Sequence, residues 1–178
     1  GDLLFTAGKD SRPNVWWSLN GERLGTFNGH NGVVWCIDVN WHSTVVISGG
    51  GDSSCKLWDL TTGKEVAQLT ANSAVRTAAF SYSANQAAYS TDRAMKQPCE
   101  LFIIDTRQVD EAAGSHPTIL KWEVTDSKVT SVLWGSLDEH LITGHEDGEI
   151  AQWDLRNGKK VQSIKEHTSS INDMQMSH

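Results

Sequence analysis

The chain of 178 residues is 38% hydrophobic and 21% charged, so it is long and apolar enough to bury a core. Its net charge of −7 would repel phosphate backbones and anionic lipid surfaces, and direct nucleic-acid binding and membrane binding are therefore not expected. The three cysteines show no Cys-x-x-Cys spacing, which argues against a disulfide framework or a zinc site and favours a cytoplasmic location.

Three copies of one pattern run along the chain. Each copy has a hydroxyl residue, an aspartate four residues later, a tryptophan six residues after that, and a glycine after five more. The copies are Thr6-Asp10-Trp16-Gly21, Ser48-Asp52-Trp58-Gly63 and Thr143-Asp147-Trp153-Gly158. Because all four positions keep their spacing, the pattern indicates a repeat architecture.

Short stretches of strand character lie between these fixed positions. Residues 45–48 and 57–60 flank one aspartate, and glycine then provides the positive φ of a tight turn at Thr62-Gly63. Further strands begin at Val34, Val75, Val129 and Ile171. The spacing predicts units of four strands at residues 1–32 (partial), 33–73, 74–127 and 128–168, with a further unit starting at 169–178.

The third unit departs from the pattern. Ile104-Asp105 stands where the others have tryptophan, and twelve residues instead of six separate it from Asp92. Its hairpin is expected to be longer, and residues 107–118 are expected to form a surface loop.

The Trp58-Asp59 and Trp153-Asp154 pairs resemble the signature of WD repeats. The resemblance implies an all-β fold, a β-propeller with seven blades when complete, of which about four fit in this chain. The chain is therefore expected to be part of a longer protein.

In WD repeats a histidine, a strand hydroxyl, a turn aspartate and a strand tryptophan form a hydrogen-bonded chain. By resemblance, His30, Ser48, Asp52 and Trp58 form it in the second unit. Thr143, Asp147 and Trp153 are the corresponding residues of the fourth unit. Ala71 and Thr125 stand near the histidine position of the third and fourth units, so these two units are expected to rely on apolar packing.

Two chemical alternatives use the same residues. Ser48, His30 and Asp52 are the residue types of a hydrolase triad, but the hydroxyl recurs as Thr6 and Thr143, whereas an enzyme needs one nucleophile. His140 and His145 suggest a metal site, but their five-residue spacing on a strand would place the rings on opposite faces. The chain is therefore predicted to be non-catalytic, without metal or cofactor.

Five tryptophans lie outside the repeat pattern: Trp17, Trp35, Trp41, Trp122 and Trp134. Packing in the core or between blades is expected for each of them. Trp35 and Arg76 are the favoured candidates for partner contacts, because each follows the first residue of a strand that lies near the central channel.

Residues 1–6, 18–27, 72–77 and 144–149 resemble the i subunit family of eukaryotic translation initiation factor 3, and the resemblance runs along the whole chain. It implies a scaffold that binds the b and g subunits and, through the complex, the small ribosomal subunit. The alternatives are another WD-repeat adaptor, such as a kinase-receptor-associated protein or a ubiquitin-ligase substrate receptor, and more remotely a propeller hydrolase.

Overall fold

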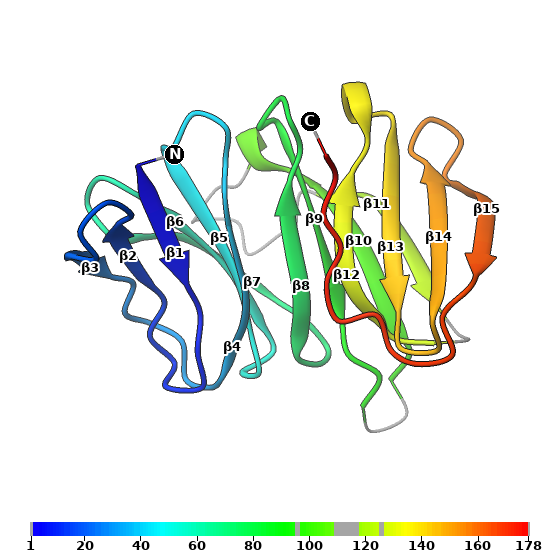
Figure 1. Cartoon of the computed structure of the whole chain (residues 1–178), viewed down its shortest axis with the longest axis horizontal. Helices are drawn as coiled ribbons and strands as arrows, with labels where there is room; N and C mark the ends of the chain where they lie inside the picture. The colour runs from blue at the N-terminus through cyan, green and yellow to red at the C-terminus, as the bar shows by residue number, and fades with distance from the viewer. Residues whose placement is uncertain (1, 95–96, 109–117, 125–126, 178) are drawn as a thin grey trace.

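In a computed structural model the chain forms four antiparallel sheets, and the structure describes residues 2–94, 97–108, 118–124 and 127–177 (Figure 1). The first sheet contains β1 (Leu3–Thr6), β2 (Asn14–Trp17) and β3 (Arg23–Thr26). The second contains β4 (Val34–Val39), β5 (Val45–Gly50), β6 (Ser54–Asp59) and β7 (Glu65–Thr70). The third contains β8 (Val75–Phe80), β9 (Gln86–Thr91), β10 (Cys99–Asp105) and β11 (Thr118–Val124). The fourth contains β12 (Val129–Trp134), β13 (His140–His145), β14 (Glu149–Asp154) and β15 (Lys159–Lys165).

The helical content of the described residues is limited to two 3-10 turns, η1 (Thr106–Gln108) and η2 (Ser136–Asp138), so the predicted all-β class is confirmed. Neither of these turns is long and apolar enough to span a membrane. Part of the loop predicted at 107–118 lies outside the described residues, because only 107, 108 and 118 are described.

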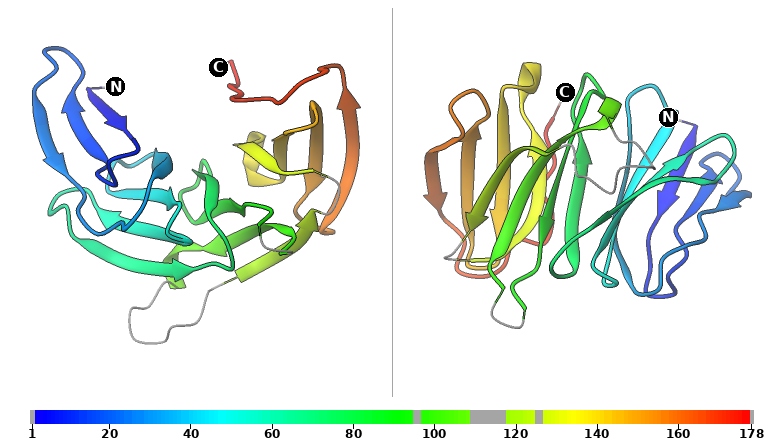
Figure 2. Two further views of the ribbon diagram at one scale, coloured as in Figure 1. Left: turned by 90° about the horizontal axis from the view of Figure 1, so that it is seen from below. Right: turned by 180° about the vertical axis from the view of Figure 1, so that it is seen from behind.

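The sheets stand side by side along an arc (Figure 2). Within each sheet, strands that are consecutive in sequence are neighbours. The first strands β4, β8 and β12 pack against one another in that order and line the concave side of the arc. This is a blade-like arrangement of sheets, while the exact unit boundaries stay a prediction.

Strand register shows which residue of the third unit takes the place of the tryptophan. Trp58 pairs with Val46 across β5 and β6, and Trp153 pairs with Leu141 across β13 and β14. The same position in the third sheet is Ile104, which pairs with Ala87. An apolar residue therefore occupies this buried position in all three sheets.

The core lies between adjacent sheets. Val46 and Trp58 of the second sheet pack with Val15 of the first, and Ile47 and Leu57 pack with the third sheet. Burying each large aliphatic side chain contributes roughly 1.5–3 kcal/mol to stability. The core residues of adjacent sheets therefore help to bury one another.

Candidate functional site

The four residues predicted to form the hydrogen-bonded chain of the second sheet meet in the structure. The Trp58 indole N–H donates to Ser48 Oγ at 2.8 Å, and His30 Nε2 lies 2.7 Å from the same oxygen. On the other side of the ring, His30 Nδ1 lies 3.0 Å from Asp52 Oδ2. Because a carboxylate only accepts, Nδ1–H donates to Asp52, and Nε2 of the neutral ring accepts from the Ser48 hydroxyl. Every polar group in this buried chain thus has a partner.

Asp52 lies on the β5–β6 turn and binds the loop between β3 and β4 by hydrogen bonds. Its carboxylate accepts from the Asn31 N–H at 2.8 Å and from Ser54 Oγ at 2.7 Å. Burial raises the pKa of Asp52, but the hydrogen bonds from Ser54, Asn31 and His30 outweigh it and hold this pKa below its ordinary value. The aspartate is therefore ionised at neutral pH and holds the imidazole in one orientation.

The backbone beside the His30 ring has no room for a side chain. A Cβ on Gly50 would lie 2.6 Å from His30 Nδ1 and 2.3 Å from Asp52 Oδ1. Glycine at this strand position is therefore a condition for placing the histidine from the preceding loop.

The fourth sheet has a hydrogen-bonded chain of the same kind, built with a different histidine. The Trp153 indole donates to Thr143 Oγ1 at 2.9 Å, and that oxygen lies 2.8 Å from His145 Nε2. His145 Nδ1 lies 3.1 Å from Ser127 Oγ, and Ser127 in turn bonds to Asp147. The expectation that this unit relies on apolar packing alone was therefore wrong.

The register shows how the two histidines replace one another. His145 pairs with Val129 as Gly50 pairs with Val34, so His145 occupies the strand position that is glycine in the second sheet. Residue 125, at the expected histidine position, lies outside the described residues. The signal for His145 was its spacing of two from Thr143, since alternate strand residues share one face.

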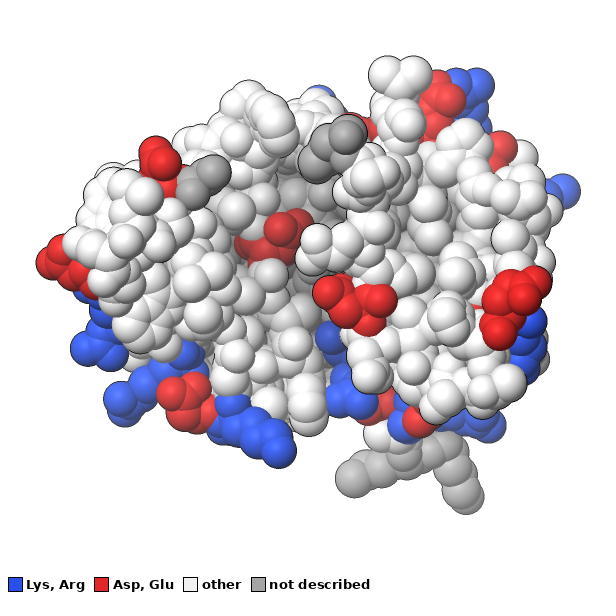
Figure 3. All heavy atoms as spheres, in the orientation of Figure 1, with Lys and Arg blue, Asp and Glu red and all other residues white. Residues whose placement is uncertain are grey.

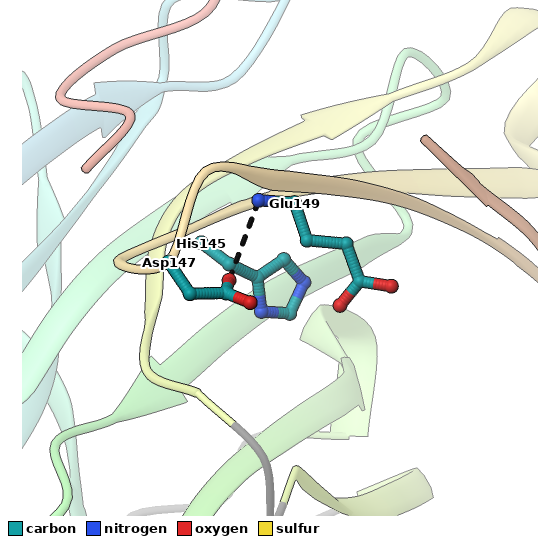
Figure 4. Close-up of side chains that lie close together, drawn as sticks. All are labelled: His145, Asp147 and Glu149. Atoms are coloured by element: carbon teal, nitrogen blue, oxygen red, sulfur yellow. Dashed lines mark hydrogen bonds between the residues drawn. The ribbon is translucent and has the colours of Figure 1, made fainter. Parts of the chain in front are cut away.

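A cluster of possible metal ligands surrounds this second histidine. His145, Asp147 and Glu149 place ligand atoms within 4.8 Å of one another (Figure 4). Both imidazole nitrogens, however, already bond to hydroxyls, Asp147 pairs with Lys165 at 2.7 Å, and Glu149 pairs with Lys160. The lysine hydrogen bond lowers the pKa of Asp147 to about 2. The geometry fits a charge-compensated polar cluster better than a cation site.

The other two sheets keep only part of the pattern. In the first sheet the Trp16 indole donates to Thr6 Oγ1 at 2.8 Å. In the third sheet Tyr89 occupies the position of Ser48, and its ring stacks on Phe102 at a centroid distance of 4.7 Å. Aromatic packing thus replaces the hydrogen-bonded chain there.

The two predicted contact residues lie against each other. The Arg76 guanidinium stands 4.4 Å from the centre of the Trp35 ring, and Arg76 Nε lies 3.5 Å from Asp92. Trp35 is 43% exposed. This stack joins the first strands of the second and third sheets, and a role in partner binding stays a prediction.

The tryptophans outside the repeat pattern do not all pack as expected. Trp134 is buried and donates to the Ala79 carbonyl at 3.0 Å, and Trp122 donates to the Gly158 carbonyl at 2.7 Å. Trp41, by contrast, is 74% exposed on the β4–β5 turn, and Trp17 is also exposed. The expectation of core or inter-blade packing was therefore wrong for Trp41 and for Trp17.

The family model of EIF3I matches residues 1–178. The chain belongs to the EIF3I family. Eukaryotic translation initiation factor 3 subunit I of Bombyx mori is 69% identical over 177 residues, which are 99% of this chain and 54% of that protein. The protein of the same description from Anopheles gambiae is 56% identical over 179 residues, 99% of this chain and 55% of that protein. The chain thus spans about half the length of the curated relatives it matches, and the resemblance is confirmed.

The two buried histidines of this EIF3I chain make its stability depend on pH. Burial is the largest influence on His30 and His145 and lowers the pKa of both below the ordinary 6.5. At these two positions the folded chain therefore binds fewer protons than the unfolded chain near and below pH 6.5. We expect the free energy of unfolding, measured with urea at a series of pH values, to be highest above this range and to fall on acidification.

A His30→Gln, His145→Gln double variant is the control for this pH dependence. It is expected to be less stable than the parent chain at neutral pH. Its free energy of unfolding should also decrease much less between about pH 7 and pH 5. An equal decrease in the variant and the parent chain would show that these two histidines do not cause the pH dependence.

Proposed function

We propose that the protein is a non-catalytic scaffold subunit of eukaryotic translation initiation factor 3, which acts in the cytoplasm. The observation that carries this proposal is the 69% identity over 177 residues to a protein described as subunit I of that factor. By the same proposal, the complete protein forms a seven-bladed propeller that binds the b and g subunits and reaches the small ribosomal subunit through the complex.

The geometry of the hydrogen-bonded chains supports a structural role for the residues that resemble a hydrolase triad. Ser48 is fully buried, and its hydroxyl oxygen is held by both His30 and Trp58. A nucleophile has to reach its substrate, and this oxygen has no access to one. The same arrangement in the fourth sheet around Thr143 fits architecture that is repeated from blade to blade.

Affinity purification of the intact tagged protein from eukaryotic cells at low salt, followed by mass spectrometry, tests the proposal. We expect the b and g subunits to be recovered in amounts comparable to the tagged protein. An unrelated tagged WD-repeat protein is the control for nonspecific capture.

The competing functions predict other results from the same purification. Recovery of a receptor kinase or of ubiquitin-ligase subunits without the b and g subunits would overturn the proposal in favour of another adaptor. Recovery of none of these partners at low salt would also count against it.

A further inference from the structure

A groove with a volume of about 610 Å³ runs along the concave side of the sheets. Its walls come from the first strands β4, β8 and β12, from the turns that follow β4 and β8, and from residues 173–176. Figure 3 looks onto this side and shows the molecule hollowed at its centre. None of the hydrogen-bonded chains described above uses this surface.

Large aromatic and sulfur-containing side chains line the groove: Trp35, Trp41, Tyr82, Trp134, Met174 and Met176. Trp41 and Tyr82 occupy equivalent positions, because each follows a residue whose N–H closes the turn after a first strand, Asn40 or Ser81. Trp41 is 74% exposed and Met176 37% exposed. Isolated exposed apolar residues are ordinary, but several converging on one concavity indicate a binding surface.

The turn after β12 lies beside the groove, because it contacts the turn that contains Tyr82. Asp138 accepts from the backbone N–H groups of Tyr82 and Ser83 at 2.8 and 2.9 Å, which holds η2 beside the β8–β9 turn. Leu137 of this turn is 84% exposed and has a φ of +62°. A leucine in left-handed backbone costs about 1–2 kcal/mol, and here the conformation leaves an aliphatic side chain in solvent.

The charged side chains that line the groove, among the described residues, are Asp38 and Asp173, without any lysine or arginine. Asp38 accepts from the Phe80 N–H at 2.8 Å and takes part in none of the ion pairs found in the described part of the chain. Burial raises the pKa of this carboxyl. In Figure 3 acidic side chains lie in and beside the hollow, whereas lysines and arginines gather along the lower edge.

We propose that this groove binds an extended peptide segment of a partner protein in which a lysine or arginine lies between apolar residues. The cation would stand over the exposed indole of Trp41, since Arg76 already stacks on Trp35, and it would pair with Asp38 or Asp173. The apolar neighbours would contact the other aromatic residues and the methionines of the groove. Nucleic acid does not fit this surface, because the two carboxylates would repel its phosphates. The inference does not depend on which complex contains the protein.

Selection of a random dodecapeptide phage library on the intact protein tests this inference. We expect enriched peptides to carry lysine or arginine flanked by apolar residues. A fluorescein-labelled enriched peptide should bind about tenfold more weakly to a Trp41→Ala variant and at least several-fold more weakly to Asp38→Asn. Its affinity should also fall between about 50 and about 500 mM NaCl.

Leu19→Ala is the matched control, because Leu19 is 89% exposed on the β2–β3 turn and lies outside the groove. The Asp38→Asn variant keeps a side-chain oxygen that can accept from the Phe80 N–H, so it is expected to fold. If it does not, Asp173→Asn replaces it in the comparison. The inference is overturned if no peptide is enriched, if enriched peptides lack a basic residue, or if they bind the groove variants and the Leu19→Ala control equally.

Discussion

Trp58→Ala is expected to lower the free energy of unfolding by about 3–5 kcal/mol, as truncations of fully buried large aromatic residues do. The indole is completely buried, and its ring lies 5.6 Å from Phe27 and 5.9 Å from His30. Its removal also leaves the Ser48 hydroxyl without its donor. Urea unfolding followed by circular dichroism measures the change.

Two further variants separate packing from hydrogen bonding at this position. Trp58→Phe keeps most of the apolar volume but removes the indole N–H, so it should cost about 1–3 kcal/mol. Trp41→Ala removes an exposed tryptophan and should change stability by no more than about 0.5 kcal/mol. If Trp58→Ala were as mild as Trp41→Ala, the second sheet would not depend on this residue.

Gly148→Ala is expected to destabilise the chain by about 2–5 kcal/mol, for two reasons that act together. Gly148 has a φ of +86°, where a side chain is strained. A Cβ there would also lie 2.1 Å from the His167 carbonyl oxygen, a backbone atom that cannot rotate away. The chain would have to move at the β13–β14 turn or at His167, and faster amide hydrogen exchange in both segments would reveal this.

Gly21→Ala is the matched control for backbone strain. Gly21 has a φ of +70°, but no atom lies within 4 Å of the place its Cβ would occupy. This variant should therefore lower the free energy of unfolding only by the cost of a side chain in left-handed backbone, about 1–2 kcal/mol. Equal losses for both variants would show that the close approach of His167 has no energetic weight.

The repeat made much of the fold predictable. Because hydroxyl, aspartate and tryptophan keep fixed separations, the positions of Ser48 and Trp58 on paired strands could be predicted without knowledge of their contacts. Ile104 could be aligned with the tryptophans for the same reason. Spacing along the chain carries this information because hairpin register follows from the number of residues between the strands.

Two features could not be predicted from the sequence: the backbone position that supplies the histidine of the fourth sheet, and the exposure of Trp41. His145 reaches Thr143 along its own strand, whereas His30 reaches Ser48 from a preceding loop, and one motif cannot describe both routes. Tryptophan is an apolar residue type that often packs in a core, but Trp41 lies on a turn and is exposed. Both depend on three-dimensional position and not on residue type.

The imidazole of the hydrogen-bonded chain can thus come from the preceding loop, as His30 does, or from the strand, as His145 does. This limits how such a blade can change during evolution. A chain that gained histidine at Gly50 while keeping His30 would place two rings in one space. A chain that lost His30 first would leave a buried serine hydroxyl and an aspartate without their common partner. Either single step is unfavourable, so exchange between the two forms requires coupled substitutions, and a blade that holds one form tends to retain it.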